Sequence, residues 1–310
     1  MRKGDINDMN ITEPEIEVIG ASIIDVLVRP AREEVFESGS YEAEDIKMSI
    51  GADALNEATI LARMGKKVRL ETIIGKDQAG QFLYRHCEKE GIQLGEGCLR
   101  DDETTGINVV LVEPDGNRDF LTNGNGTLRS LTIDDIHMPF PDSVKVICFA
   151  SIFVFPKIGT KEMQEIFETA KKQGKIVCAD MTKCKHGETV EDLAPALAHI
   201  DYLLPNDEEA MRFTRTDCVE DAADRLKAAG VGNVIIKCGK RGCYIRTDEE
   251  ARWMSAVKGA HCIDTTGAGD SFVAGFLCAL LEGKNVIECA ENGGICGAKA
   301  VEVMGATEWI

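Results

Sequence analysis

A short glycine-containing segment near the C-terminal end of the chain combines residues that could bind and transfer a phosphoryl group. It reads DTTGAGDSFVAGF and covers residues 264–276. Its apolar second half indicates a buried helix, so the N–H groups of Gly267, Ala268 and Gly269 would lie at the helix N-terminus without helical partners. Such a terminus binds anions, and glycine lets a phosphate approach the backbone closely. Asp270, in the first turn, could then accept a proton from an attacking hydroxyl.

The same segment also fits a purely structural role. Asp264, Thr266 and Asp270 are residue types that commonly lie at helix N-termini, where their side chains cap free N–H groups. Taken alone, the segment therefore leaves helix capping and phosphate chemistry both open.

Composition limits the partners of the chain. Its 310 residues include 53 acids and 35 bases, for a net charge of −18. This charge repels phosphate backbones and anionic lipid, so we expect neither nucleic acid nor a membrane as a partner. The N-terminal region has no apolar signal core, and twelve scattered cysteines without a Cys-x-x-Cys pair are typical of free thiols in a reducing compartment. We therefore expect a cytoplasmic protein.

Apolar, β-branched runs alternate with helix-length segments along the chain. The runs are residues 16–28, 67–75, 144–151, 175–181, 200–206 and 233–239, and the helical segments between them include 52–65, 160–174 and 220–230. A strand–helix–strand order of this kind predicts an α/β fold, in which a parallel sheet is covered by helices on both faces.

Two segments interrupt this alternation. Residues 35–50 alternate polar and apolar side chains without room for a helix, which predicts one or two extra strands. Residues 107–121 contain an Asp-Gly turn between apolar runs and predict a hairpin. We expect these strands, within about 31–50 and 105–122, to form a small sheet that acts as a lid on a single domain spanning residues 1–310.

The segment 264–276 resembles the C-terminal signature of the ribokinase-like, or PfkB, carbohydrate kinases, Asp-Thr-x-Gly-Ala-Gly-Asp. The resemblance implies a three-layer sandwich with a mainly parallel central sheet and a small β-sheet lid, and a kinase that phosphorylates a sugar with ATP and Mg²⁺. It makes Asp270 the catalytic base and places the anion hole at residues 267–269. Because this loop binds potassium in many members, it also suggests K⁺ at Asp264 and Thr266.

Two N-terminal segments resemble the substrate-binding parts of the same family. VIGASIIDVLVRP resembles the first strand, where an acid holds substrate hydroxyls, which would be Asp25. GADALNEATILARMG resembles the signature Gly-Gly-x-x-x-Asn through Gly51 and Asn56, with Ala52 in place of the second glycine. Arg118, just after the predicted hairpin turn, could bind a carboxylated substrate or could be a solvated base.

Two later segments resemble the nucleotide-binding parts. LLPNDEEA matches the motif Asn-x-x-Glu, whose Glu209 would act on Mg²⁺ through water, although a helix cap is the alternative. KCGKRGCY matches a Gly-x-x-Gly turn that lines the nucleotide, with solvated surface bases as the alternative. The nucleotide-binding residues implied are Asn206, Lys237, Gly239, Lys240, Gly242 and Gly269.

The residues favour an uncharged sugar without settling the substrate. Asp53 occupies a position where members that take phosphosugars usually carry lysine, and an acid there would repel a substrate phosphate. An aromatic content of 5% disfavours stacking on a nucleoside. A nucleoside, a keto-deoxy sugar acid held by Arg118, and a non-catalytic sugar or nucleotide sensor remain alternatives.

The predicted lid also bears on assembly. Ile46, Met48 and Ile50 would give a small sheet an apolar face that cannot remain in water uncovered. We therefore expect a homodimer in which two lids pack against each other.

Overall fold

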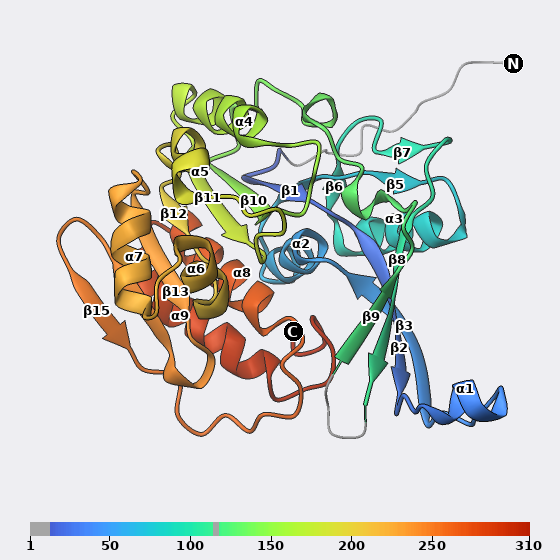
Figure 1. Cartoon of the computed structure of the whole chain (residues 1–310). Helices are drawn as coiled ribbons and strands as arrows, with labels where there is room; N and C mark the ends of the chain where they lie inside the picture. Colours follow the sequence, from blue (N-terminus) through green and yellow to red (C-terminus); the bar gives the residue numbers. More distant parts are fainter. Residues whose placement is uncertain (1–12, 114–117) are drawn as a thin grey trace, which may run out of the picture.

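One large sheet lies between two layers of helices (Figure 1). The computed structural model describes residues 13–113 and 118–310, and within them nine strands form this sheet. In spatial order they are β15 (Ala251–Met254), β14 (Cys243–Arg246), β13 (Asn233–Lys237), β12 (Tyr202–Leu203), β11 (Ile176–Met181), β10 (Val146–Ile152), β1 (Ile16–Gly20), β4 (Val68–Glu71) and β6 (Gln93–Leu94). Neighbours from β13 to β6 pair in parallel, and β14 and β15 pair antiparallel. The predicted mainly parallel α/β architecture is confirmed.

The side chains of strand β10 reach both faces of the sheet, and helices cover each face. Its side chains alternate between two apolar cores, with Ile147 and Phe149 in one and Val146 and Cys148 in the other. The first core is covered by α4 (Thr160–Lys172), α5 (Val190–Leu197), α6 (Asp207–Thr214) and α7 (Val219–Ala228). The second is covered by α2 (Asp53–Arg63), α3 (Gln78–Glu90), α8 (Ala268–Leu281) and α9 (Val286–Ala300). Because both faces of this strand are buried in apolar cores, nearly all of its side chains are apolar.

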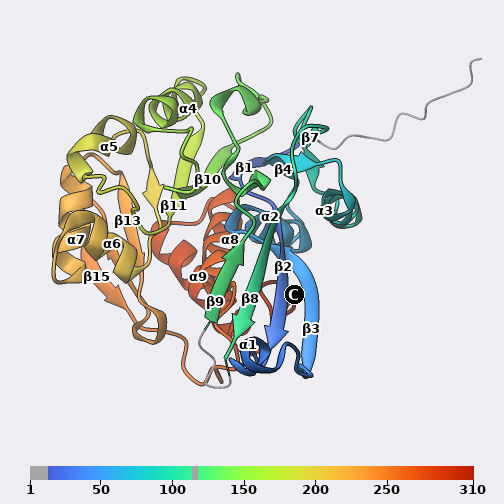
Figure 2. The same ribbon diagram turned by 45° about the vertical axis from the view of Figure 1, so that its right-hand side comes forward.

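A second, smaller sheet projects from the core, as Figures 1 and 2 both show. In order, its strands within the described residues are β3 (Asp45–Gly51), β2 (Ile23–Arg29), β8 (Gly106–Val112) and β9 (Arg118–Thr122). Strands β8 and β9 form the antiparallel hairpin that the sequence predicts. Its Asp-Gly turn lies outside the described residues, as does the start of the N-terminal region that we searched for a signal sequence. We call this four-stranded sheet the lid.

Two local predictions were wrong. The apolar run 16–28 is two strands in two sheets, because the chain leaves the core after Gly20, where a Cβ would lie only 2.0 Å from the Ala150 carbonyl oxygen. The segment 35–50, predicted to lack a helix, contains most of α1 (Glu34–Ser38), a single turn that ends at Gly39 with φ 79°. A further pair of short strands, β5 (Ile74–Gly75) and β7 (Leu99–Arg100), forms a separate ribbon.

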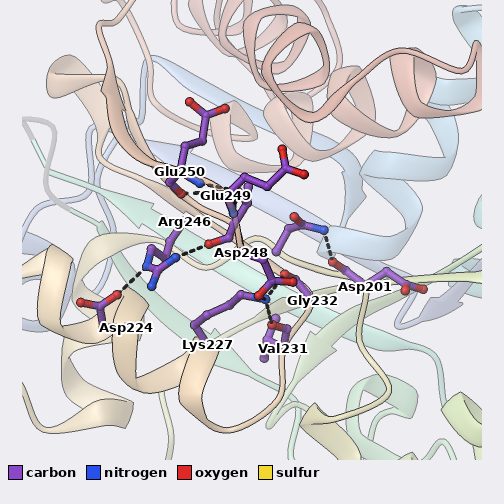
Figure 3. Close-up of polar contacts among 11 residues, drawn as sticks. Asp201, Asp224, Lys227, Val231, Gly232, Arg246, Asp248, Glu249 and Glu250 are labelled. Carbon is purple, nitrogen blue, oxygen red and sulfur yellow. Dashed lines mark hydrogen bonds and ion pairs between the residues drawn. The ribbon is translucent and has the colours of Figure 1, made fainter.

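Polar contacts near one edge of the large sheet fix helix α7 to strand β13 (Figure 3). Lys227 of α7 donates to two carbonyl groups of the loop that enters β13, at 3.1 and 2.5 Å. On the neighbouring strand, the Arg246 Nε donates to Asp224 of α7 at 2.6 Å. These contacts hold the strand whose other end carries Lys237.

The described helices include none that is both long and apolar enough to cross a membrane. All twelve cysteines lie in the described part of the chain and carry free thiols, and most of them are buried. The prediction of free rather than paired cysteines is confirmed.

Candidate active site

The glycine turn at the start of α8 has the geometry that the sequence predicts. Gly267 precedes the helix with φ 69°, and a Cβ on it would lie 2.5 Å from Ala306, so only glycine fits. The Ser271 N–H donates to the Gly267 carbonyl at 2.8 Å and begins the helix. The Ala268 N–H, which we expected to be free, donates to the Thr265 carbonyl at 3.3 Å, a long and weak contact.

Asp270, in the first turn of α8, is in direct contact with helix α2. The Asn56 side-chain amide donates to the Asp270 carboxylate at 2.7 Å, which joins residues 214 positions apart in the chain. The pKa of Asp270 is raised to about 8, because burial and the charge of Asp53 outweigh the opposing Asn56 hydrogen bond and the charge of Lys237. A carboxyl group with such a pKa can accept a proton near neutral pH.

Asp25 lies in strand β2 of the lid rather than in the core. Its carboxylate accepts a hydrogen bond from the Asn108 side chain at 3.2 Å. A Cβ on Gly51, in the neighbouring strand, would lie 2.4 Å from an Asp25 carboxylate oxygen, which explains the glycine there. Burial raises the pKa of Asp25 to about 6, with Asn108 opposing and Asp53 adding to the shift.

The start of helix α2 links the lid to the catalytic turn. Asp53 accepts a hydrogen bond from the Ser151 hydroxyl, and its charge acts on both Asp25 and Asp270. Ala52, which precedes the helix, has φ 74° and ψ 147°, a conformation that glycine adopts at much lower cost. The signature that this segment resembles has glycine at this position, where this chain has an alanine with a positive φ.

Lys237 ends strand β13 and faces the glycine turn. Its ammonium donates to Asp180 at 2.5 Å and lies 3.6 Å from where a Cβ on Gly269 would be. Burial favours the neutral amine, but the charges of Asp180 and Glu209 outweigh it and raise the pKa of Lys237, which stays charged. Asp180 was not among the predicted site residues, and its one signal in the sequence is an acid at the C-terminal end of a predicted strand.

Asn206 and Glu209 form the helix cap that the sequence left as an alternative. The Glu209 N–H donates to the Asn206 side chain and the Asn206 N–H donates to the Glu209 carboxylate, each at 2.9 Å. Burial raises the pKa of Glu209 to about 7, with Asp180 adding to the shift and Lys237 opposing it. Among the described residues, no group of three or more acids, histidines or cysteines is placed to hold a metal directly. The cap uses one oxygen of the Glu209 carboxylate, so the other could act on a magnesium ion through water, as the family resemblance implies.

The predicted nucleotide turn directly follows Lys237 and β13. Residues Gly239–Arg241 form a single 3₁₀ turn, and Gly242 has φ 96° with no space for a Cβ, which would lie 1.9 Å from the Met254 carbonyl oxygen. Arg241 pairs with Asp207 at 2.7 Å and so is held on the surface of α6, whereas Lys240 is exposed.

Asp264 and Arg118 are brought together from distant parts of the chain. The Asp264 carboxylate accepts hydrogen bonds from the Thr266 N–H at 3.0 Å, the Thr266 hydroxyl at 2.7 Å and the Gly305 N–H at 3.0 Å, and it pairs with the Arg118 guanidinium. Burial would raise the pKa of Asp264, but these contacts outweigh it and lower the pKa. Because both oxygens have donors and the charge is balanced, these residues do not fit the potassium ion that the resemblance suggested.

Comparisons with known proteins agree with this geometry. A sugar kinase of unassigned substrate from Archaeoglobus fulgidus is 27% identical over 252 residues, which cover 80% of this chain and 96% of that protein. The 2-dehydro-3-deoxygluconokinase of Haemophilus influenzae is 25% identical, covering 83% of this chain and 88% of that protein. The ribokinase of Arabidopsis thaliana, solved with ribose and ATP, superimposes with a TM-score of 0.79 at 23% identity, over 96% of this chain and 95% of that one, and confirms the ribokinase-like fold. With a family match that spans residues 13–310, the chain belongs to the pfkB family of carbohydrate kinases.

Proposed function

We propose that this carbohydrate kinase transfers the terminal phosphoryl group of ATP to a hydroxyl of an uncharged sugar, with Asp270 as the base. The hydrogen bond between Asn56 and Asp270 carries the proposal. It sets a buried carboxylate between the glycine turn of α8 and the residues of α2 that resemble the substrate signature. Ribose and ATP in the structure of the Arabidopsis ribokinase support the same pair of substrates here.

On the acceptor side, the sugar is held by carboxylate and amide oxygens. The Asn56 Oδ1 is buried and has no hydrogen-bond partner among the described residues, so a sugar hydroxyl would satisfy it. Asp25, in strand β2 of the lid, accepts a hydrogen bond from a second hydroxyl. The hydroxyl that faces Asp270 gives up its proton to that carboxylate as its oxygen attacks the phosphoryl group.

On the donor side, the protein supplies positive charge and N–H groups. Lys237 and the N–H groups of residues 267–269 would stabilise the transferred phosphoryl group, with the Ala268 N–H giving up its long contact to the Thr265 carbonyl. The turn from Gly239 to Gly242, with Lys240 and Asn206, lines the nucleotide. A magnesium ion, held through water near Glu209, would neutralise phosphate charge.

The excess of acids in the site favours an uncharged acceptor. The charge of Asp53 raises the pKa of both Asp25 and Asp270, and a carboxylate or phosphate on the sugar would add a further negative charge beside these acids. Arg118, which we first considered as a partner for such a group, is already paired with Asp264.

A keto-deoxy sugar acid is the second candidate, favoured by one observation. Lys185 lies close enough to Arg129 and Asp53 for their charges to act on its pKa. Burial has the largest effect and lowers the pKa of Lys185, and the charge of Arg129 lowers it as well. Two bases near Asp53 could bind a carboxylate. The relationship to 2-dehydro-3-deoxygluconokinase points the same way.

A coupled assay for ADP release distinguishes the candidates. Pentoses, hexoses, keto-deoxy sugar acids, sugar phosphates and nucleosides are compared by kcat/KM. We expect a neutral pentose or hexose to give the highest value, and Lys185→Met to leave it unchanged. A sugar acid preferred by tenfold or more, with that preference lost in Lys185→Met, would establish the second candidate instead.

We further propose that residues 1–310 form one domain and that the lid makes a homodimer. Strand alternation puts Asp25 on one face of the lid and Ile46, Met48 and Leu121 on the other, where they are 67%, 50% and 60% exposed. A second copy would cover this apolar face. The free thiols support a reducing, cytoplasmic location.

A further inference from the structure

We infer that Arg118 replaces a monovalent cation at Asp264, so that the lid itself supplies the positive charge that fixes the loop before the catalytic turn and the kinase needs no potassium. Arg118 is the first residue of β9 in the lid, and Asp264 lies three residues before Gly267. The inference goes beyond the proposed function, because it concerns how the site is held and does not depend on which sugar is bound.

The loop from Asp264 to Gly267 is fixed on one side by the C-terminal segment. The N–H groups of Ile263 and Asp264 donate to the Val301 carbonyl at 2.7 and 3.2 Å, and Gly267 packs against Ala306. The Gly305 N–H holds the second oxygen of the Asp264 carboxylate. These contacts position the backbone but supply no positive charge.

The lid supplies that charge. The Asp264 side chain is almost fully buried, and a buried carboxylate needs a counter-charge to remain ionised. Arg118 provides one guanidinium for one carboxylate. A potassium ion at the same oxygens would leave an unbalanced cation in a partly buried place, or would have to displace the guanidinium.

The pair also links the lid to the catalytic turn. Arg118 and Asp25 belong to the same four-stranded sheet, on β9 and β2. A sugar that holds the lid down through Asp25 therefore also holds Arg118 against Asp264, next to the turn that precedes Asp270. Arg118 is a positioning residue in this account, since it acts through Asp264 and not on the reacting atoms.

A cavity beside the pair makes the inference testable. It has a volume of about 500 Å³, and its lining includes Arg118 of the lid, Arg32 of the connection between β2 and α1, and Asp264. Shortening Arg118 would open Asp264 to this cavity, and a small cation could enter from it.

The first experiment uses the wild-type enzyme in KCl, NaCl and choline chloride at equal ionic strength. We expect the same kcat, within twofold, and the same Tm in all three salts. A severalfold higher kcat in KCl, or a Tm that rises with KCl alone, would overturn the inference.

The second experiment compares three variants. Arg118→Ala should lose at least tenfold in kcat in choline chloride, regain part of it with KCl or millimolar guanidinium, and gain Tm with KCl, since a bound ion stabilises the folded state. Arg118→Lys should keep activity without potassium. Arg32 also lines this cavity but pairs with Glu34 at 3.8 Å, so Arg32→Ala should behave as wild type.

The outcomes separate this inference from the proposed substrate chemistry. Normal kcat in Arg118→Ala, or a raised KM for the sugar alone in both Arg118 variants, would show that Arg118 does not position the loop. The Tm measurements need no sugar, so they decide the cation question even if the acceptor substrate proves to be a different one.

Discussion

At the scale of single residues, Asp270 is the group on which the proposed chemistry depends. Asp270→Asn keeps the shape of the side chain but cannot accept the hydroxyl proton. We expect kcat to fall by about 10² or more, the usual effect of losing a general base, while the Kd for ATP and the Tm stay near wild type. Near-normal turnover in this variant would remove Asp270 from the mechanism.

The pKa of the same carboxyl predicts a pH dependence. The base must be ionised, so kcat/KM should rise with pH through the pKa of Asp270, which lies at about 8. Asp53→Asn removes a nearby negative charge that disfavours ionisation, so the rising limb should move to lower pH. The pH profile of kcat/KM measures this directly.

The matched control for that profile is Asp119→Asn. Asp119 is exposed in β9, on the opposite face of the lid from Asp25. Asp119→Asn therefore removes the same negative charge as Asp53→Asn, but at a position away from the site. If both variants shifted the limb equally, or neither did, Asp53 would not be the neighbour that sets it.

Residues within one continuous motif could be located from the sequence, and their partners could not. The turn at Gly267 follows from a local pattern, because the backbone conformation and the helix start depend on adjacent residues. The Asn56–Asp270 and Arg118–Asp264 contacts join residues 214 and 146 positions apart, and only the packed sheet brings them together. Asp180 was missed because one acid at a strand end has no distinctive spacing.

At the scale of elements, strands could be predicted where an apolar run of residues forms a single strand of the large sheet. Strands β10 and β11 are apolar because helices cover both of their faces, and their runs were found. The run from Ile16 onward is equally apolar for two different reasons, since β1 lies in the core and β2 lies in the lid. Hydrophobicity alone cannot mark the change of sheet between them.

The start of helix α2 gives a prediction about stability. Ala52 has a positive φ, which costs about 1–3 kcal/mol in a residue other than glycine, while glycine adds roughly 0.5–1 kcal/mol of entropy cost. Ala52→Gly should therefore raise the free energy of unfolding by about 1 kcal/mol, as measured by urea denaturation.

Ala62→Gly is the control for this change. Ala62 lies inside the same helix, where glycine should instead lower the free energy of unfolding by about 1 kcal/mol. Equal losses in the two variants would mean that the backbone at Ala52 is not strained.

At the scale of the whole molecule, the lid connects three parts of the proposed function. One of its faces carries Asp25 toward the sugar, β9 carries Arg118 to Asp264, and the other face is apolar and exposed. A sheet with these attachments has to keep a fixed shape while it covers the substrate. Packing of its outer face against a second copy would provide that support, because a small sheet has little core of its own.

The last prediction tests that assembly. By light scattering at micromolar concentration, the wild-type protein should have twice the mass of one chain. Ile46→Asp should reduce this to the mass of one chain, because a carboxylate buried in the contact between two lids is unfavourable. The same variant should raise the KM for the sugar, since an unsupported lid holds it less well. Ile295→Asp, which changes an exposed isoleucine of α9, should keep both the mass and the KM. A wild-type mass of one chain would contradict the dimer, and a doubled mass that persists in Ile46→Asp would place the contact between copies on a different surface.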